Sequence, residues 1–321
     1  MDSRVYFEVI NLIKVGSLFS GGIDGMAQGF KMAGVGETVI ANDIDNRAAE
    51  LLNHNYNHKV IHADIRGLSW HEFENCNVIA ITAPCQYYSN ARNINKDSMY
   101  HQAQGRSLYL HGFRMIAMVQ PEVYIAENVP QYLDYKIPKE CFTELRPYDT
   151  YVIQADTQDF RLPQVRSRVY FLGIRRKFAN GRYTSPDIFQ HQIYERQQHI
   201  KDIKEDDPEI NIPNYMKKRL DGKYRDLPSI KSDKDIANTA VAHYAKDRST
   251  TLVFDNNGYK GLRPFTPREY ARLQGIPDTY DLSPVSMTTK YHMIGNSVSP
   301  VICRAIALEV KKHFEELNSH E

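Results

Sequence analysis

A thiol, a carboxyl group and two guanidinium groups stand out along the chain, each beside a run of apolar residues. Cys85 follows the run VIAITAP, and Glu127 ends the run VYIAE. Arg166 and Arg168 alternate in QVRSRVYFLG, so in a strand they would point to the same face. Gathered at one edge of a sheet, such groups suit covalent catalysis on a polar ring.

A glycine-rich segment and two acids form a second group of chemically useful residues. LFSGGIDG, residues 18–25, runs from an apolar segment into glycines, which let the backbone approach a ligand closely. Asp43 and Asp64 follow the next two apolar segments, where acids commonly hold ribose hydroxyls. Because the chain has no GxxxxGK[ST] phosphate loop, these residues indicate a nucleoside cofactor rather than a phosphate-rich one.

Alternating strands and helices would bring both groups of residues to one edge. The apolar segments predict strands over residues 14–19, 37–42, 78–82, 123–127, 151–155 and 169–173. Helical spacing predicts helices over residues 26–33, 47–54, 107–119 and 300–317. This alternation is typical of an α/β fold with a doubly wound parallel sheet, in which ligands bind at the carboxyl ends of the strands.

The composition is that of a folded globular protein. Of the 321 residues, 42% are hydrophobic and 25% are charged, and no apolar run approaches the roughly 20 residues of a membrane span. The four cysteines form no CxxC pair, so we expect no metal site and no disulfide framework, and a reducing, cytoplasmic setting is favoured. The formal net charge is only +1, so any binding to nucleic acid must rely on local clusters of charge.

The stretch from Arg176 to about Gly261 differs from the rest of the chain in its residue composition and pattern. It carries dense mixed charge in ERQQH, KDIKEDD, KKRLDGKYRD and KSDKD without alternation of strands and helices, which predicts a separate, irregular module. Its best candidates for contacts with a nucleic-acid backbone are basic and cluster in one short segment. They are Lys217, Lys218, Arg219, Lys223 and Arg225.

The motifs taken in order carry a resemblance to a known family. FSG, ND, ADI, PCQ, ENV, QVRSR, RPFTPREYARLQGIPD and GNSVSP resemble the motif series of the DNA (cytosine-5-)-methyltransferases, which keep a variable target-recognition region where this chain is charge-rich. The resemblance implies a Rossmann-like S-adenosylmethionine-dependent methyltransferase sheet with a second, smaller target-recognition domain. Residues 1–175 and 286–321 would form the catalytic, cofactor-binding domain, and residues 176–285 the DNA target-recognition domain.

The same resemblance implies a role for each catalytic candidate. Cys85 would add as a thiolate to carbon 6 of cytosine, so that carbon 5 accepts a methyl group from S-adenosyl-L-methionine and leaves S-adenosyl-L-homocysteine. Glu127 would contact N3 and the exocyclic amine. Arg166 would contact the base, whereas Arg168 would organise the site. Either Arg168 or a helix N-terminus would favour the Cys85 thiolate.

The resemblance also implies a cofactor site, residue by residue. Phe19 would lie beneath the adenine, Asp43 would bind the ribose, and Asp64 would contact the adenine edge. The full expected set is Phe19, Ser20, Gly21, Gly22, Asp43, Ile44, Asp64, Ile65, Pro84, Leu108, Asn296 and Ser297. The chain departs from the family pattern here in two ways. Ile23 and Asp24 stand where the first loop usually has a second glycine pair, and Ile44 replaces an aromatic residue.

The expected partner is double-stranded DNA, bound by a monomer of bacterial or phage origin that flips the target cytosine out of the stack. Residues 87–104, polar and poor in core residues, would form the catalytic loop, with Arg92, Lys96 and Arg106 near phosphates. The DNA sequence that is recognised and the existence of a partner restriction endonuclease are left open.

Two other functions compete with this interpretation. One is a methyltransferase of the same family that acts on cytosine in transfer RNA, whose members carry a CFT triplet before the TPRE motif. This chain has CFT at residues 141–143, but ahead of QVRSR, so we interpret it as a coincidence. The other is a catalytically silent DNA-binding relative, against which the presence of Cys85, Glu127 and Arg166 speaks.

Overall fold

A computed structural model describes residues 12–85, 99–134, 141–142, 145–176, 185–209, 211–224, 228–248 and 250–318. Side chains are described from Leu108 onward in the helix that begins at Met99, and up to Glu315 in the last helix.

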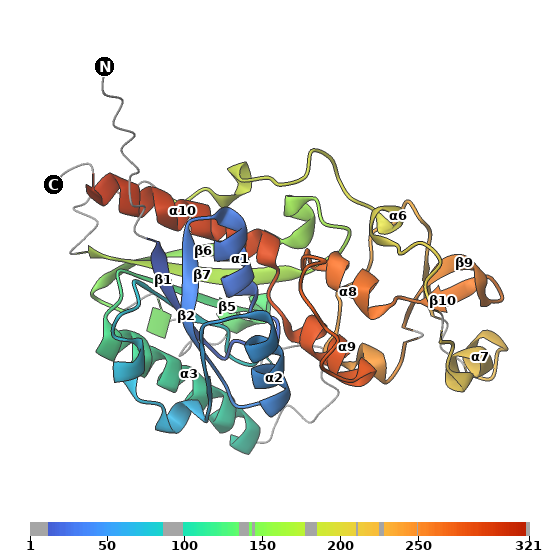
Figure 1. The fold of residues 1–321 in the computed structure, drawn as a ribbon, viewed down its shortest axis with the longest axis horizontal. Helices are drawn as coiled ribbons and strands as arrows, with labels where there is room; N and C mark the ends of the chain where they lie inside the picture. The colour runs from blue at the N-terminus through green and yellow to red at the C-terminus, as the bar shows by residue number, and fades with distance from the viewer. Residues whose placement is uncertain are drawn as a thin grey trace.

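A seven-stranded sheet forms the centre of the molecule (Figure 1). Its strands are β1 (Ile13–Leu18), β2 (Gly36–Asp43), β3 (Lys59–His62), β4 (Val78–Ile81), β5 (Val123–Asn128), β6 (Tyr148–Asp156) and β7 (Ser167–Arg175). They lie in the order β3-β2-β1-β4-β5-β7-β6, and β1 to β5 are parallel. The strand order reverses between β1 and β4, where open α/β sheets bind their ligands. The predicted α/β, doubly wound fold is therefore confirmed.

Strand β7 differs from the predicted parallel arrangement. It runs antiparallel to both β5 and β6, and Glu127 at the end of β5 pairs with Tyr170. No crossover helix separates β6 from β7, only a 3₁₀ turn over Thr157–Phe160, and a short connection of this kind suits antiparallel strands. The reversal brings the start of β7, which carries Arg168, to the end of β5.

Helices cover both faces of this sheet (Figure 1). On one face, Phe30 of α1 and Ile302 of α10 are fully buried against Val15 of β1. On the other face, Ile116 of α3 is fully buried in a cluster with Ile81 of β4. The helices are α1 (Gly25–Ala33), α2 (Asn46–Asn55), α3 (Met99–Val119) and α10 (Pro300–Asn318).

A second, three-stranded sheet lies at the far end of the molecule from the first strands (Figure 1). Two of its strands fall in the charge-rich stretch that was predicted to be irregular. The signal was too short to recognise, because β8 has three residues and only Thr251 to Val253 of β9 are buried. The elements of this region are α6 (Ile200–Ile203), α7 (Asn214–Leu220), β8 (Ser229–Lys231), β9 (Thr251–Tyr259), β10 (Leu262–Pro264), α8 (Pro267–Leu273) and α9 (Met287–Asn296).

The segment RPFTPREYARLQ is engaged in internal contacts. Thr266 caps α8 by accepting a hydrogen bond from the Glu269 amide, and the Glu269 carboxylate accepts one from the Thr266 amide. The same carboxylate, fully buried, accepts a hydrogen bond of 2.6 Å from the Arg263 guanidinium. These residues therefore join α8 to β10, which is an architectural role.

One stretch of the described chain, Met287–Glu315, is long and apolar enough to cross a membrane. Its most apolar window is 83% buried inside the protein. It consists of α9 and α10, which supply residues to two of the hydrophobic clusters, so it belongs to the core.

Asp24, one of the departures from the family pattern, begins α1. It is 1% exposed, has a φ of 46°, and its Oδ1 accepts a hydrogen bond of 3.0 Å from the Ala27 amide. Burial raises the pKa of this carboxyl from 3.8 to about 6, although the hydrogen bond from Ala27 opposes the rise. Asp24 thus keeps the helix cap but destabilises the fold once it is ionised.

Asp24→Asn should stabilise the protein more at pH 8 than at pH 4, by about 2 kcal/mol. Because the pKa in the fold is raised, the stability linked to this group is present at low pH and is lost as the pH rises through about 6. Asparagine retains the capping oxygen and tolerates a positive φ. Urea unfolding of both proteins at the two pH values measures the difference, and an equal effect at both would contradict the prediction.

Candidate active site

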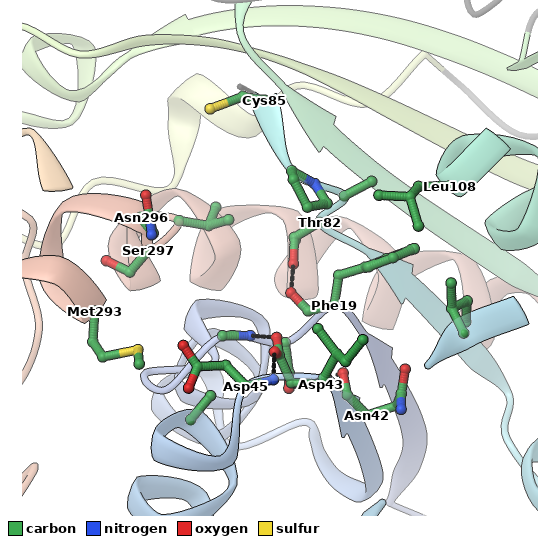
Figure 2. A pocket seen from close by; sticks show the side chains of 18 of the residues that line it. Phe19, Asn42, Asp43, Asp45, Thr82, Cys85, Leu108, Met293, Asn296 and Ser297 are labelled. Atoms are coloured by element: carbon green, nitrogen blue, oxygen red, sulfur yellow. Dashed lines mark hydrogen bonds between the residues drawn. The ribbon is translucent and has the colours of Figure 1, made fainter. Parts of the chain in front are cut away.

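The carboxyl ends of the central strands open onto a cavity of about 340 Å³ (Figure 2). Every residue predicted for catalysis or cofactor binding lines it except Gly22. The Gly22 carbonyl instead accepts a hydrogen bond from the Tyr280 hydroxyl. Residues that are far apart in the sequence thus share one site: most lie at the ends of strands of the same sheet, whereas Leu108 comes from α3 and Asn296 and Ser297 from the end of α9.

The turn after β1 is fixed by hydrogen bonds to the neighbouring strand ends. The Thr82 hydroxyl donates to the Phe19 carbonyl over 2.8 Å, and the Gly21 amide donates to Asp43 Oδ2 over 2.8 Å. Gly21 has a φ of 61°, a conformation that favours glycine. Phe19 also has a positive φ, 56°, and such unfavourable backbone geometry is common at ligand sites. The turn is therefore held in one shape before any ligand binds.

Asp43 occupies the centre of the cavity wall (Figure 2). Its Oδ2 accepts the hydrogen bond from Gly21, and its Oδ1 accepts one of 2.9 Å from the Asp45 amide. Burial raises the pKa of this carboxyl, although both amides oppose the rise. The remaining lone pairs of Asp43 are available to hydroxyl donors in the cavity.

The lining of the cavity also combines apolar side chains with a second acid. Ile65 and Leu108 line it together with Ile44, which is 64% exposed. Asp64 accepts hydrogen bonds from both the amide and the guanidinium of Arg66, and this pairing lowers the pKa of Asp64. A flat apolar group with a polar edge would match this wall.

Cys85 stands where β4 ends, on the rim of the cavity (Figure 2). The preceding turn is tied to β5, because the Asn128 side-chain amide donates to the Ala83 carbonyl over 3.1 Å and to the Tyr109 hydroxyl. The Cys85 side chain is partly exposed. Burial raises the pKa of its thiol, and the positive charge of Arg168 opposes that rise.

Glu127 and Arg168 form an ion pair at the same end of the cavity. Glu127 Oε1 lies 3.1 Å from Arg168 Nε, and both side chains are largely buried. Burial raises the pKa of Glu127, while Arg168 and then Arg166 act against the rise. The site therefore contains a nucleophile, a carboxyl group that retains its proton above the usual pH range, and a fixed positive charge.

Arg166 has different surroundings from those of Arg168. It is 3% exposed, and its guanidinium donates to the backbone carbonyls of Ala240, Gly295 and Ser297. Burial lowers the pKa of Arg166 to about 9. The two terminal nitrogens of its guanidinium are thus held by backbone carbonyls.

Several residues of the cavity were missed by sequence reasoning. His292 and Met293 of α9 line it next to the predicted Asn296, and His292 Nε2 lies 3.1 Å from Asn296 Nδ2. The four-residue spacing of His292 and Asn296 places them on one helix face, a signal that could have found His292. The other missed residues are Asn42, Asp45, Ala48, Ala63, Arg66, Thr82, Ala83, Gly295 and Val298.

Some predicted contacts with nucleic acid lie outside the described residues. This applies to residues 87–98 of the predicted catalytic loop, with Arg92 and Lys96, and to Arg225. Residues 99–104, predicted as the end of that loop, are instead the first turns of α3, and the side chain of Arg106 is not described.

The described part of the basic cluster is only partly free for a ligand. Lys217 lies over the Tyr259 ring, 5.7 Å from its centre, and Arg219 forms an ion pair with Asp247. Lys218 and Lys223 are exposed. Internal contacts therefore occupy two of the predicted phosphate-binding residues.

Comparisons with known proteins agree with this geometry. Residues 13–312 match the model of the family described as C-5 cytosine-specific DNA methylase. The chain is 27% identical over 316 residues to the type II methyltransferase M1.ScrFI of Lactococcus lactis subsp. cremoris, covering 94% of this chain and 79% of that protein. It is 26% identical over 314 residues to the tRNA (cytosine(38)-C(5))-methyltransferase of Schizosaccharomyces pombe, covering 89% and 93% of the two chains.

A solved structure shows the same fold. The crystal structure of S. pombe Dnmt2 methyltransferase matches this one with a TM-score of 0.76 at 22% identity, covering 95% of this chain and 99% of the other. The family model spans nearly the whole chain, including every strand of both sheets and all of the cavity. The chain therefore belongs to the C-5 cytosine-specific DNA methylase family, whose members take their methyl group from S-adenosyl-L-methionine.

Proposed function

We propose that this protein is a sequence-specific DNA cytosine-5 methyltransferase. One observation carries the proposal. The Cys85 thiol and the Glu127–Arg168 ion pair line the same cavity as the residues predicted to bind a nucleoside. This arrangement can present a nucleophile, an acid and a methyl donor to one polar ring.

The cavity suits S-adenosyl-L-methionine. Its volume of about 340 Å³ is typical of ligand pockets, Phe19 and Leu108 offer apolar faces to the adenine, and Asp43 accepts from the ribose hydroxyls. Asn296 and Ser297, which also line the cavity, would hold another part of the cofactor. When bound, this group supplies an electrophilic methyl carbon on a positively charged sulfur.

Cys85 acts on a cytosine that has been flipped out of the duplex. The thiolate donates its electron pair to carbon 6, an S–C6 bond forms, and ring electrons shift toward carbon 5. Arg168 favours this thiolate, because its positive charge opposes the rise in the pKa of the Cys85 thiol that burial causes. Carbon 5 takes the methyl group, leaving S-adenosyl-L-homocysteine, and then loses its own proton to water. The electrons of that C5–H bond reform the C5–C6 double bond, the S–C6 bond breaks to release the Cys85 thiolate, and N3 returns to Glu127 any proton it received from that residue.

Glu127 assists the addition as an acid. Burial raises the pKa of Glu127 and so favours the protonated carboxyl group, whose proton we assign to N3 of the ring. With N3 protonated, the negative charge brought by the thiolate is neutralised as the S–C6 bond forms. Glu127 and Cys85 therefore work as a pair.

The surroundings of the two arginines favour roles opposite to those expected from the resemblance. Arg168 contacts Glu127 and lowers the pKa of Cys85 more than Arg166 does. We therefore propose that Arg168 is the arginine that contacts the reacting base. Arg166 donates its hydrogen bonds to backbone carbonyls, so we propose that it positions the surrounding backbone rather than the base.

DNA is the substrate that we favour over transfer RNA. Phe142, the middle residue of the CFT triplet, is fully buried against Phe171 and Phe113, so its side chain cannot contact a nucleic acid. We propose that residues 176–285 form the target-recognition domain and that residues 1–175 and 286–321 form the catalytic domain. Lys218 and Lys223, both exposed, are candidates for contacts with phosphates.

Bisulfite sequencing of plasmid DNA from cells that express the protein tests this proposal and identifies the target. Methylated cytosines within one short repeated sequence are the expected result. In parallel, the purified protein is incubated with labelled S-adenosyl-L-methionine and either duplex DNA or total RNA. Label in RNA alone would assign the protein to the transfer RNA branch, and label in neither would favour a silent binding protein.

The biological setting is also a proposal. Relatives such as M1.ScrFI come from bacteria. We infer a cytoplasmic enzyme that acts as a monomer on DNA, because one cavity of this chain brings together the predicted catalytic and cofactor-binding residues.

Asp43→Ala should weaken the binding of S-adenosyl-L-homocysteine by about 10- to 100-fold. The change removes charged acceptors for two ribose hydroxyls and also frees the amides of Gly21 and Asp45 that the carboxylate holds. Isothermal titration calorimetry measures the affinity. Glu50→Ala, on the exposed side of α2, is the control, and unchanged affinity in a folded Asp43 variant would refute the role.

A further inference from the structure

The segment Ala237–Ala242, here called the seam segment, joins the charge-rich region to the catalytic sheet. It lies beside the residues that lead into β7, since the Val165 amide donates to the Ala237 carbonyl over 3.0 Å. The Thr239 hydroxyl donates to the Val165 carbonyl, and the Ala240 amide donates to Gln164 Oε1, each over 2.6 Å. This side of the seam segment is thus fixed to the catalytic sheet.

The other side of the seam segment faces the end of α9. A Cβ atom on Gly295 would lie 2.3 Å from the Ala242 nitrogen, so the two backbones touch. Gly295 is also part of the cavity wall, together with Asn296 and Ser297. The seam segment therefore packs directly behind the turn that we assign to the cofactor.

Arg166 connects these parts through one guanidinium group. One terminal nitrogen donates to the Ala240 carbonyl over 2.9 Å, and the other donates to the carbonyls of Gly295 and Ser297 over 3.1 and 2.7 Å. A buried charge is costly unless its hydrogen bonds are kept. Displacement of either the seam segment or the turn would break one or two of these bonds, so the two move together.

We propose that Arg166 is a positioning residue that couples the cofactor-binding turn Gly295–Ser297 to the seam segment, so that cofactor binding orders the attachment of the recognition region. The inference rests on the proposed function, because it takes this turn as part of the cofactor site. It assigns no contact with the reacting base to Arg166.

Hydrogen–deuterium exchange of the full chain with and without saturating S-adenosyl-L-homocysteine tests the coupling. We expect amide exchange in peptides that cover residues 237–242 to slow by about fivefold or more when the compound is bound. These amides do not line the cavity, so direct shielding by the ligand does not account for the effect. Unchanged exchange there in the wild-type protein overturns the proposal.

Arg166→Lys provides the matched comparison, because lysine keeps the charge but cannot bridge carbonyls in two directions. Less than half of the ligand-dependent slowing should remain, whereas Thr239→Val, which removes a seam hydrogen bond unconnected to α9, should retain it. A purely structural role for Arg166 would speed exchange equally with and without ligand. Full ligand-dependent slowing of exchange in Arg166→Lys would also overturn the proposal. If this variant does not fold, the exchange of the wild-type protein alone supports or overturns the coupling.

The same data separate this inference from the proposed function. Slower exchange over residues 19–22 and 43–45 with none over 237–242 would reject the coupling and leave the cofactor site intact. If titration calorimetry shows no binding and no peptide changes, the proposed function itself fails.

Discussion

Cys85→Ser is expected to reduce the rate of methyl transfer by at least about 10³-fold. A serine hydroxyl ionises far less readily than a thiol, so at the rim of this cavity it would remain protonated even beside Arg168. The measurement is incorporation of labelled methyl groups into the DNA sequence found by bisulfite sequencing. A rate within tenfold of wild type would show that Cys85 is not the nucleophile.

Binding measurements keep this result interpretable. The variant should bind S-adenosyl-L-homocysteine within about threefold of wild type, because Cys85 is not among the predicted cofactor contacts and serine is nearly the same size. A second test uses duplex DNA with 5-fluorocytosine at the target, where fluorine cannot leave carbon 5 as a proton does. Wild type should form a covalent complex that survives denaturing electrophoresis, and neither Cys85→Ser nor a Cys85→Ala control should form it.

The residues at strand ends could be predicted because local pattern determines them. Asp43, Cys85 and Glu127 each follow an apolar run that forms a parallel strand, and parallel strands present their carboxyl ends at one edge. Once the strands were recognised, the parallel arrangement of the sheet predicted that these three residues would meet at one cavity. Their chemical roles remain predictions that rest on the resemblance and on this geometry.

Features that depend on distant contacts could not be predicted. The partners of Arg166 are carbonyls more than 70 residues along the chain, and backbone carbonyls carry no signature in a sequence. The direction of β7 depends on the length of its connection, which the apolar pattern does not record. In the second sheet, only the first three residues of β9 are buried. The outer half of β9 is polar, so the sequence shows no apolar pattern long enough to predict this strand.

Glu127→Gln is expected to lower kcat by about 10²- to 10⁴-fold. Glutamine has nearly the same size and can still accept a hydrogen bond from Arg168, but it has no proton to give to N3. The affinity for the cofactor product should change little. A kcat within threefold of wild type would show that the ring is not protonated by this residue.

The pH profile distinguishes proton transfer by Glu127 from a structural role. The reactive form has an ionised Cys85 and a protonated Glu127, so the wild-type kcat/KM should rise with pH and then fall when both groups are ionised. Both pKa values are raised by burial, which places the maximum above the usual range of carboxyl groups. In Glu127→Gln only the Cys85 thiol titrates, so the rate should rise to a plateau without a fall. A retained fall would assign the second titration to another group, whereas Glu127→Asp, which keeps an ionisable acid, should restore the bell shape at a reduced rate.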